Sequence, residues 1–354
     1  MPMDSNDTLL SRNEANAIKG VLILLVILGH DIPFIRLTDS WMVMVWIYLF
    51  HIHCFFLIPF LYTIKRLSPQ RLLDLFIRFY TPFLTVFIML LLLKMNTTTG
   101  GGKTRLINLV LCLASGNPLR LKELTGVQFL WFLPAMFMCC IVKEWHSCSI
   151  RPLKCLFLLI GAASLLLPFL SLEVPELLYN PLFGFRFLFL GILVRWLLLR
   201  NVFGNYAAIV LFVSGSLCFF IHYRYCLHPF YWGYPVGHIH HALRLLMPVV
   251  FLHLLFHLRG NLSKIKLLVH FGENSFSIYL FHAFFGYASS WFMMRCGVKD
   301  WLAAPICFLS ISFFSLYASR FLYAHPIFKS CLMPKGWMDF SMAWKKTLLL
   351  LIWK

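Results

Sequence analysis

Two ionisable side chains, Lys19 and His30, stand eleven residues apart in an otherwise apolar stretch. At about 100° per residue of an α-helix, eleven residues return to nearly the same face, roughly 16 Å further along the axis. A histidine titrates near neutrality and can accept a proton from a hydroxyl, whereas a lysine can neutralise a phosphate. The alternative is a lysine that snorkels to the membrane surface and a histidine at the opposite headgroup level.

A second group of small and polar residues follows the spacing i, i+4, i+7, i+11 and i+14 through a Phe-rich stretch: Ser275, Tyr279, His282, Gly286 and Ser289. This spacing places all five on one face of a helix. Small residues on such a face favour contact with another helix. The histidine among them favours a cavity, because ionisable groups inside a bilayer usually face a cavity or a partner.

Two further histidines, His51 and His53, are separated by one residue and therefore point about 200° apart on a helix. Only one of them can line the same cavity, and the other is expected to be a packing residue. Asp31 adjoins His30 but points about 100° away, so we do not expect it to orient the imidazole.

Four histidines lie within the connector 222–241: His228, His238, His240 and His241. No carboxylate lies near them and their spacing is not that of a metal site, so we predict no metal. We expect an outer loop that contacts sugar through three aromatic rings, those of Tyr231, Trp232 and Tyr234.

Arg71, Asp74 and Arg78 follow the spacing i, i+3, i+7 at the start of an apolar run. From the residues alone, we expect a solvated basic face with a local Asp74–Arg78 pair.

The elements that must position these residues follow from composition. Of 354 residues, 60% are hydrophobic and only 12% are charged, with a mean hydropathy of +0.80. These values exclude a soluble globule and a disordered chain. Since a spanning helix needs about 20 apolar residues, we predict an all-α integral membrane protein, a polytopic bundle of about ten transmembrane helices. The expected spans are residues 17–34, 41–64, 75–93, 129–142, 153–170, 182–199, 206–221, 242–258, 271–294 and 301–322.

The net charge of +18 lies mainly in short connectors between apolar runs, which indicates lipid headgroups rather than nucleic acid as partners, with a polyanionic small ligand as the alternative. Lysine and arginine are more abundant on the side of the N-terminus, so both termini are expected in the cytoplasm. Residues 1–16 then form a cytoplasmic segment, 17–322 the transmembrane domain, and 323–354 a cytoplasmic tail on the membrane surface. A short re-entrant or interfacial helix is expected at 106–114. The 11 cysteines have no metal-binding spacing and are expected to be free thiols.

The stretch from Asn16 to His30 resembles the first helix of the membrane acyltransferase family 3, whose hallmark is Arg or Lys, ten residues, and His. At Asn16, many relatives carry Asp. Four further segments resemble family motifs in the same order: Phe50 to Phe56, Phe76 to Pro82, Leu130 to Ala135, and Gly272 to His282. In the first of these, Ile58 and Pro59 replace the Ser-Gly that usually follows.

The resemblance implies an O-acyltransferase that uses acyl-CoA, most simply acetyl-CoA, as co-substrate, with no bound cofactor. The acceptor would be a hydroxyl of a bacterial surface glycan or a lipid-linked precursor, and the location the bacterial inner membrane. His30 would be the general base, and an acyl-histidine relay stays open. The donor phosphates would lie near Lys19, Arg71 or Arg78.

The cavity of this enzyme would be lined by His51, which the resemblance favours over His53, and by Ser275, Tyr279 and His282. The rival interpretation is a transporter without covalent chemistry, in which buried histidines relay protons. Against it, we find no internal repeat of the kind that many transporters have.

Overall fold

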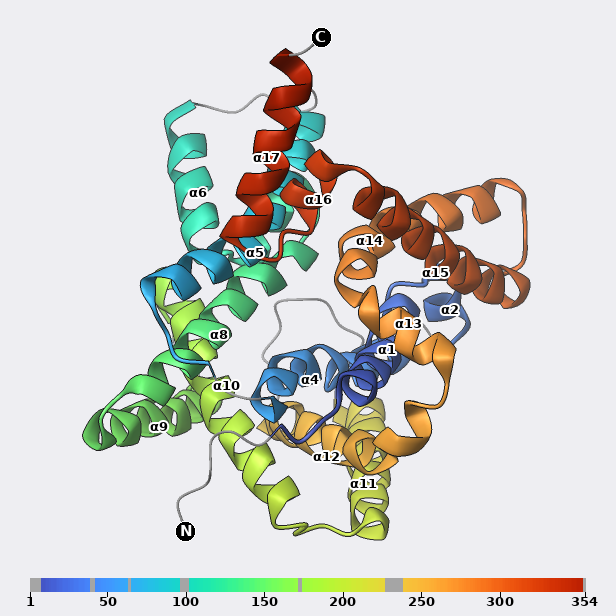
Figure 1. The fold of residues 1–354 in the computed structure, drawn as a ribbon. Helices are drawn as coiled ribbons and strands as arrows, with labels where there is room; N and C mark the ends of the chain where they lie inside the picture. The colour runs from blue at the N-terminus through green and yellow to red at the C-terminus, as the bar shows by residue number, and fades with distance from the viewer. Residues whose placement is uncertain are drawn as a thin grey trace. The chain divides into compact units, whose positions relative to one another are not determined.

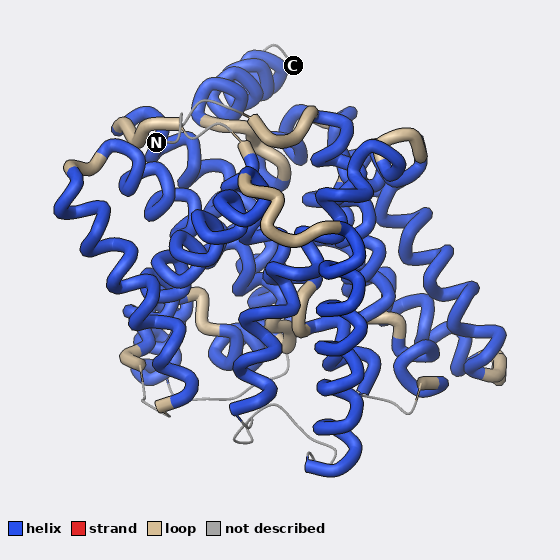
Figure 2. The backbone as a smooth tube through the Cα atoms, turned by 90° about the horizontal axis from the view of Figure 1, so that it is seen from below, coloured by secondary structure: helices blue, strands red, loops and turns tan. Residues whose placement is uncertain are grey.

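The computed structural model describes residues 8–38, 42–62, 65–95, 102–170, 174–226 and 238–352. Over these residues every regular element is a helix, and Figure 2 shows no strand among them. Within this described part of the chain, seven segments are long and apolar enough to cross a membrane: Met42–Leu61, Pro69–Leu92, Arg151–Phe169, Glu176–Leu199, Asn205–Arg224, His238–Leu262 and Asp300–Ala324. The prediction of a helical membrane protein is therefore confirmed in its coarse form, and the number ten stays a prediction.

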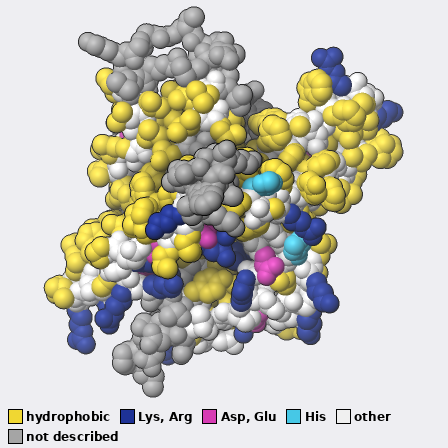
Figure 3. Space-filling view, turned by 45° about the horizontal axis from the view of Figure 1, so that its top comes forward, with side chains coloured by type: hydrophobic (Ala, Val, Ile, Leu, Met, Phe, Trp, Pro, Cys, Tyr) yellow, Lys and Arg dark blue, Asp and Glu magenta, His cyan; other side chains and the backbone are white. Residues whose placement is uncertain are grey.

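The surface agrees with this assignment. Large apolar side chains such as those of Leu159, Phe313 and Leu309 are each more than 60% exposed, and Figure 3 shows hydrophobic side chains over much of the surface. A soluble monomer rarely exposes apolar patches of that extent. The ten cysteines whose side chains are described are all free, as the sequence predicts.

The chain divides into two compact units. Unit 1 comprises Met1–Thr63 and Leu190–Arg320, and unit 2 comprises Ile64–Phe189 and Phe321–Lys354. The elements within unit 1 are α1 (Arg12–Gly29), α2 (Ile32–Leu37), α3 (Met42–Tyr48), α4 (His51–Leu57), η1 (Ile58–Leu61), α11 (Asn205–Cys226), α12 (His238–Leu262), α13 (Lys266–Glu273) and α14 (Ser275–Arg295).

Unit 2 contains α5 (Pro69–Met95), α6 (Gly102–Ser115), α7 (Pro118–Thr125), η2 (Phe129–Trp131), α8 (Phe132–Cys148), α9 (Arg151–Leu166), η3 (Leu167–Phe169), α16 (Pro326–Leu332) and α17 (Trp337–Ile352). The boundaries between the units fall inside α10 (Glu176–Leu199) and α15 (Asp300–Ala324). The expected short helix at 106–114 lies inside α6.

The central helix of unit 1 is α1, which Figure 1 shows beside α4, α12 and α13. It begins with a capping box, in which the Ser11 hydroxyl accepts from the Glu14 N–H and the Glu14 carboxylate accepts from the Ser11 N–H. Its buried apolar residues include Leu22, Ile23 and Ile27.

α1 ends at Gly29, earlier than the expected single span 17–34. Asp31 is the N-cap of α2 and accepts from the Phe34 N–H at 3.1 Å. Pro33 has no N–H to donate to the carbonyl of Gly29, so the α-helical ladder stops there. His30 is consequently the C-cap of α1, not an interior residue.

Two other expected spans are also interrupted. The span 41–64 forms α3, then α4 and η1, with a break at Leu49 and Phe50. The span 271–294 is broken at Asn274, whose side chain donates to the His270 carbonyl and accepts from the Ser319 hydroxyl at 3.0 Å. In both cases side chains or turn bonds satisfy the backbone and the polar groups at the break, as helices in an apolar environment require.

Backbone contact without intervening side chains joins α1 and α13. A Cβ atom on Gly20 would collide with the carbonyl oxygen of Leu268, and one on Gly272 with that of Asn16. The contact partner moves forward along α13, from Leu268 to Gly272, as the position moves backward along α1, from Gly20 to Asn16. The two helices are therefore antiparallel. Glycine is therefore required at both positions by space.

In unit 2, Asp74 of α5 accepts from the backbone N–H of Trp337 at 2.9 Å and so caps the start of α17. Asp74 also accepts from Gln70 at 3.5 Å. The prediction of an Asp74–Arg78 pair is wrong, because no ion pair joins these two described side chains. The Asp74 carboxylate instead accepts from the first backbone N–H of α17.

We expect Gly272→Ala to lower the free energy of unfolding by about 1–3 kcal/mol, the usual cost of forcing extra atoms into a packed contact. Gly260→Ala is the matched control, because a Cβ there meets nothing within 4 Å. Thermal unfolding of both variants in detergent gives the comparison. Equal midpoints for the two variants would contradict the α1–α13 packing.

Candidate functional site

His30 lies at the point where α1 ends, and its side chain is half-buried. Its Nε2 atom is 2.7 Å from the hydroxyl oxygen of Tyr48, the last residue of α3. Either group can be the donor, depending on the tautomer of the imidazole. The break before Asp31 therefore places the histidine against a neighbouring helix.

His51 extends this contact. Its ring centroid lies 4.8 Å from that of Tyr48, with the rings nearly perpendicular. The side chain is completely buried, and its Nδ1 atom lies 2.7 Å from the carbonyl oxygen of Ile47. The neighbouring His53 is instead bonded to Arg244, whose Nε donates to its Nε2 at 3.2 Å. The two histidines thus have different surroundings, and His51 is the one beside His30 and Tyr48.

His282 approaches His30 from α14. The ring centroids are 4.6 Å apart, and His282 is completely buried. Its Nδ1 lies 2.6 Å from the Tyr279 carbonyl. One turn further along α14, a Cβ on Gly286 would lie 3.5 Å from the backbone oxygen of His30. The backbone of α14 therefore lies close to the end of α1 at this point.

The polar face expected on α14 is therefore turned inward over its middle. Tyr279, His282 and Gly286 are buried, whereas Phe284, on the other side, is 68% exposed. Ser275 is half-buried at the start of the helix, and no described contact joins it to the histidines.

The backbone carbonyls beside His51 and His282 determine which ring nitrogen of each neutral histidine carries the proton. A carbonyl oxygen only accepts, so a neutral His51 or His282 donates from Nδ1–H and keeps its lone pair on Nε2. For His51, Nε2 has no hydrogen-bond partner among the described residues. The cluster His30, Tyr48, His51 and His282, all from unit 1, thus offers lone pairs that can accept from a hydroxyl.

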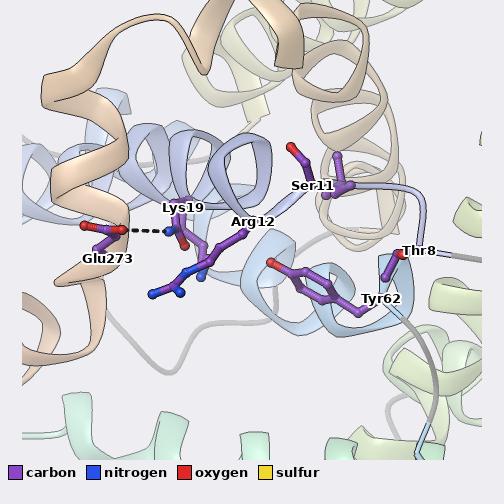
Figure 4. Close-up of a pocket in the computed structure, with 8 residues that line it drawn as sticks. Thr8, Ser11, Arg12, Lys19, Tyr62 and Glu273 are labelled. Atoms are coloured by element: carbon purple, nitrogen blue, oxygen red, sulfur yellow. Dashed lines mark hydrogen bonds between the residues drawn. The ribbon is translucent and has the colours of Figure 1, made fainter.

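Lys19 lies on the same helix as His30, toward its other end, and lines a cavity of about 550 Å³. Figure 4 shows Lys19 and Arg12 leaving α1 on the same side, with Glu273 and Tyr62 around them. The Asn16 amide of α1 donates to Glu273 at 3.5 Å. The cavity and the histidine cluster therefore lie at opposite ends of α1.

The other two expected donor residues belong to unit 2. Arg71 donates to both oxygens of Glu144, at 3.0 and 2.8 Å for the closest contacts, and the Glu144 side chain is only 5% exposed. Arg78 is exposed, with its guanidinium carbon 5.6 Å from the centroid of the Phe79 ring. Arg71 is thus held by a buried carboxylate.

His238, His240 and His241 stand at the start of α12, whereas His228 and the three aromatic residues expected to contact sugar, Tyr231, Trp232 and Tyr234, lie outside the described residues. Within the part of the chain that the structure describes, no group of three or more His, Cys, Asp and Glu side chains is arranged to hold a metal ion.

Sequence reasoning missed three residues that the structure places at these sites: Tyr48, Arg12 and Glu144. Tyr48 gave no reliable signal, because the break at Leu49 and Phe50 puts it on a different helix from His51. Arg12 precedes Lys19 by seven residues, which is one helical face and was a usable signal. Glu144 gave no such signal, because its partner Arg71 is 73 residues away.

Comparisons of this chain with models of protein families, with curated proteins and with solved structures give no match. The interpretation of the site therefore depends on the geometry and on the sequence motifs.

We expect Glu144→Ala to cost about 3–5 kcal/mol of stability, because it leaves the partly buried Arg71 guanidinium without its partner. Asp300→Ala removes the carboxylate of a looser pair, in which Arg36 is 45% exposed and the N–O distance is 3.7 Å, and should cost about 1 kcal/mol or less. Thermal unfolding of the two variants tests the difference. A Glu144→Ala protein as stable as the Asp300→Ala protein would show that Arg71 does not depend on this carboxylate.

Proposed function

We propose that this chain is an integral membrane O-acyltransferase that transfers an acyl group, in the first instance acetyl, from acyl-CoA to a hydroxyl of a bacterial cell-surface glycan or its lipid-linked precursor. The observation that carries the proposal is the 2.7 Å hydrogen bond between His30 and Tyr48, in contact with two further buried histidines. The sequence motifs that resemble membrane acyltransferase family 3 support the same chemistry. We place the enzyme in the bacterial inner membrane with both termini in the cytoplasm, on the distribution of Lys and Arg.

In this mechanism His30 is the general base. The tautomer that donates Nε2–H to the Tyr48 oxygen leaves the Nδ1 lone pair for the proton of the acceptor hydroxyl. The hydroxyl oxygen then attacks the carbonyl carbon of the thioester, the carbon–sulfur bond breaks, and the imidazolium returns its proton to the coenzyme A thiolate. An acyl-histidine route would use the same side chain as nucleophile.

Tyr48 is a positioning residue in this scheme. A hydrogen bond to one ring nitrogen fixes both the tautomer and the orientation of a catalytic imidazole. His51 and His282 would accept hydrogen bonds from other hydroxyls of the sugar through their Nε2 atoms. Tyr279 supplies the carbonyl that orients His282, and Ser275 completes the expected polar face of α14.

In this proposal Lys19 binds the acyl donor, acyl-CoA. It lies eleven residues before His30, roughly 16 Å along α1, which is too far for a role in proton transfer at the thioester. Coenzyme A carries its thiol on an extended arm well removed from its phosphates, so a cation at that separation suits the phosphate end. Arg71 and Arg78 belong to unit 2, and a donor role for them stays a prediction of the sequence; Arg71 would first have to leave Glu144.

We expect His30→Ala to lower the rate of acyl transfer by a factor of about 10² to 10⁴, since loss of a general base typically has that effect. Release of free thiol from acetyl-CoA by purified protein with lipid-linked glycan is the measurement, and it also separates an enzyme from a transporter. His325→Ala, which removes an exposed histidine, is the control. Transfer at the wild-type rate in His30→Ala would overturn the mechanism.

We expect Tyr48→Phe to lower kcat by about 10-fold or more while leaving the KM for acetyl-CoA nearly unchanged, because the hydroxyl acts on the imidazole and not on the donor. The pH at which the rate is half-maximal should also move. Tyr317→Phe, at a site that is 64% exposed, should change neither quantity. If KM rises while kcat and the pH profile stay constant, Tyr48 does not position His30.

A further inference from the structure

The cavity at the N-terminal end of α1 is lined mainly by residues with polar side chains. The described residues that line it are Thr8, Leu10, Ser11, Arg12, Asn16, Lys19, Tyr62 and Glu273, and Leu10 is the aliphatic one among them. Ligand cavities are usually lined mainly by apolar and aromatic groups with a few polar ones. A volume of about 550 Å³ is within the range of small-molecule sites. This cavity therefore suits a polar ligand rather than an acyl chain or a sterol.

Among the described residues, the charges that line this cavity are two cations and one anion. Arg12, Asn16 and Lys19 are spaced i, i+4 and i+7, so α1 presents a guanidinium, an amide and an ammonium along one face. Glu273, at the end of α13, supplies the carboxylate, which the Asn16 amide contacts. The excess of positive charge favours an anion, and the carboxylate opposes one.

The separation of the two cations indicates the kind of anion. Seven helical residues span about 10 Å along the axis, which is too far for both cations to hold one phosphate. A guanidinium binds a phosphate through two parallel N–H donors, and an ammonium binds it as a point charge. Arg12 and Lys19 together thus match a ligand with phosphate groups at two places.

We infer that this cavity binds the phosphorylated nucleotide end of the acyl donor, with Arg12 as the second cation beside Lys19, and that Glu273 weakens this binding. The inference rests on the proposed function, and it adds a binding residue, Arg12, that the sequence motif does not include. Arg12 takes one phosphate group and Lys19 another, while the hydroxyls of Ser11, Thr8 and Tyr62 are donors that can reach the remaining oxygens or the ribose.

The test is direct binding, measured by calorimetry on the purified full-length protein in neutral detergent. Coenzyme A, ADP and adenosine are the probes, and adenosine lacks phosphate. We expect coenzyme A and ADP to bind and adenosine not to bind. Arg12→Ala should weaken coenzyme A binding at least 10-fold and flatten its salt dependence, and Arg12→Lys should recover part of the loss.

Two variants separate a binding role from a structural one. Glu273→Gln removes the opposing charge and should tighten coenzyme A binding two- to tenfold, a direction that general damage to the fold would not produce. Arg36→Ala removes an exposed arginine beyond the other end of α1 and should leave binding unchanged. His30→Ala should bind coenzyme A as wild type does while losing acyl transfer.

The outcomes distinguish this inference from the proposed function. If coenzyme A binds and acyl transfer occurs, but Arg12→Ala binds coenzyme A as wild type does, the inference is overturned and the proposed acyltransferase activity is retained. If ADP binds through Arg12 but no acyl transfer is found, the nucleotide-binding role of the cavity is retained and the proposed acyltransferase activity is overturned. If the nucleotides fail to bind while vesicles containing phosphatidylglycerol bind through Arg12, the cations serve lipid headgroups and the inference is overturned.

Discussion

The close backbone contact between α1 and α13 is the constraint on which both parts of the candidate site in unit 1 depend. Gly20 and Gly272 allow the two helices to touch without side chains between them. α13 therefore ends beside Asn16, where it delivers Glu273 to the cavity. α14 then returns along α1 in the same direction as α1, and Gly286 arrives against His30. One contact thus sets the geometry at both ends of the helix.

Interrupted helices bring the histidines and Tyr48 together at the other end of α1. His30 follows the end of α1, Tyr48 ends α3, and His51 begins α4. An uninterrupted helix would direct each of these side chains sideways from its own axis, whereas a break lets the chain turn toward a neighbour. Such breaks inside apolar bundles are stable only where the freed backbone groups find partners. Asp31 is such a partner for α2, and binding sites in membrane proteins are often built on broken helices.

Three arginines of this chain illustrate two kinds of surroundings. Arg71 and Arg120 each face a carboxylate, Glu144 and Glu176, at 2.8 and 2.6 Å, and so join helices within unit 2. Arg12 is exposed beside a polar cavity in unit 1. A guanidinium already bound to a buried carboxylate must give up that bond to bind a phosphate. Burial and partner, rather than residue type, therefore separate the arginines that join helices from the arginine that we propose as a phosphate ligand.

The sequence by itself determined that the chain is helical and apolar enough for a membrane, because hydropathy and length are local properties. It also determined that Tyr279 and His282 share a face, since they lie on one continuous helix. The break at His30 is also local, because Pro33 and the Asp31 cap that produce it lie within four residues. The tertiary structure decided the rest. The break at Asn274 has a distant partner, Ser319, 45 residues further along the chain. The meeting of His30, Tyr48, His51 and His282 depends on how three segments pack, and no local pattern encodes the distance between them.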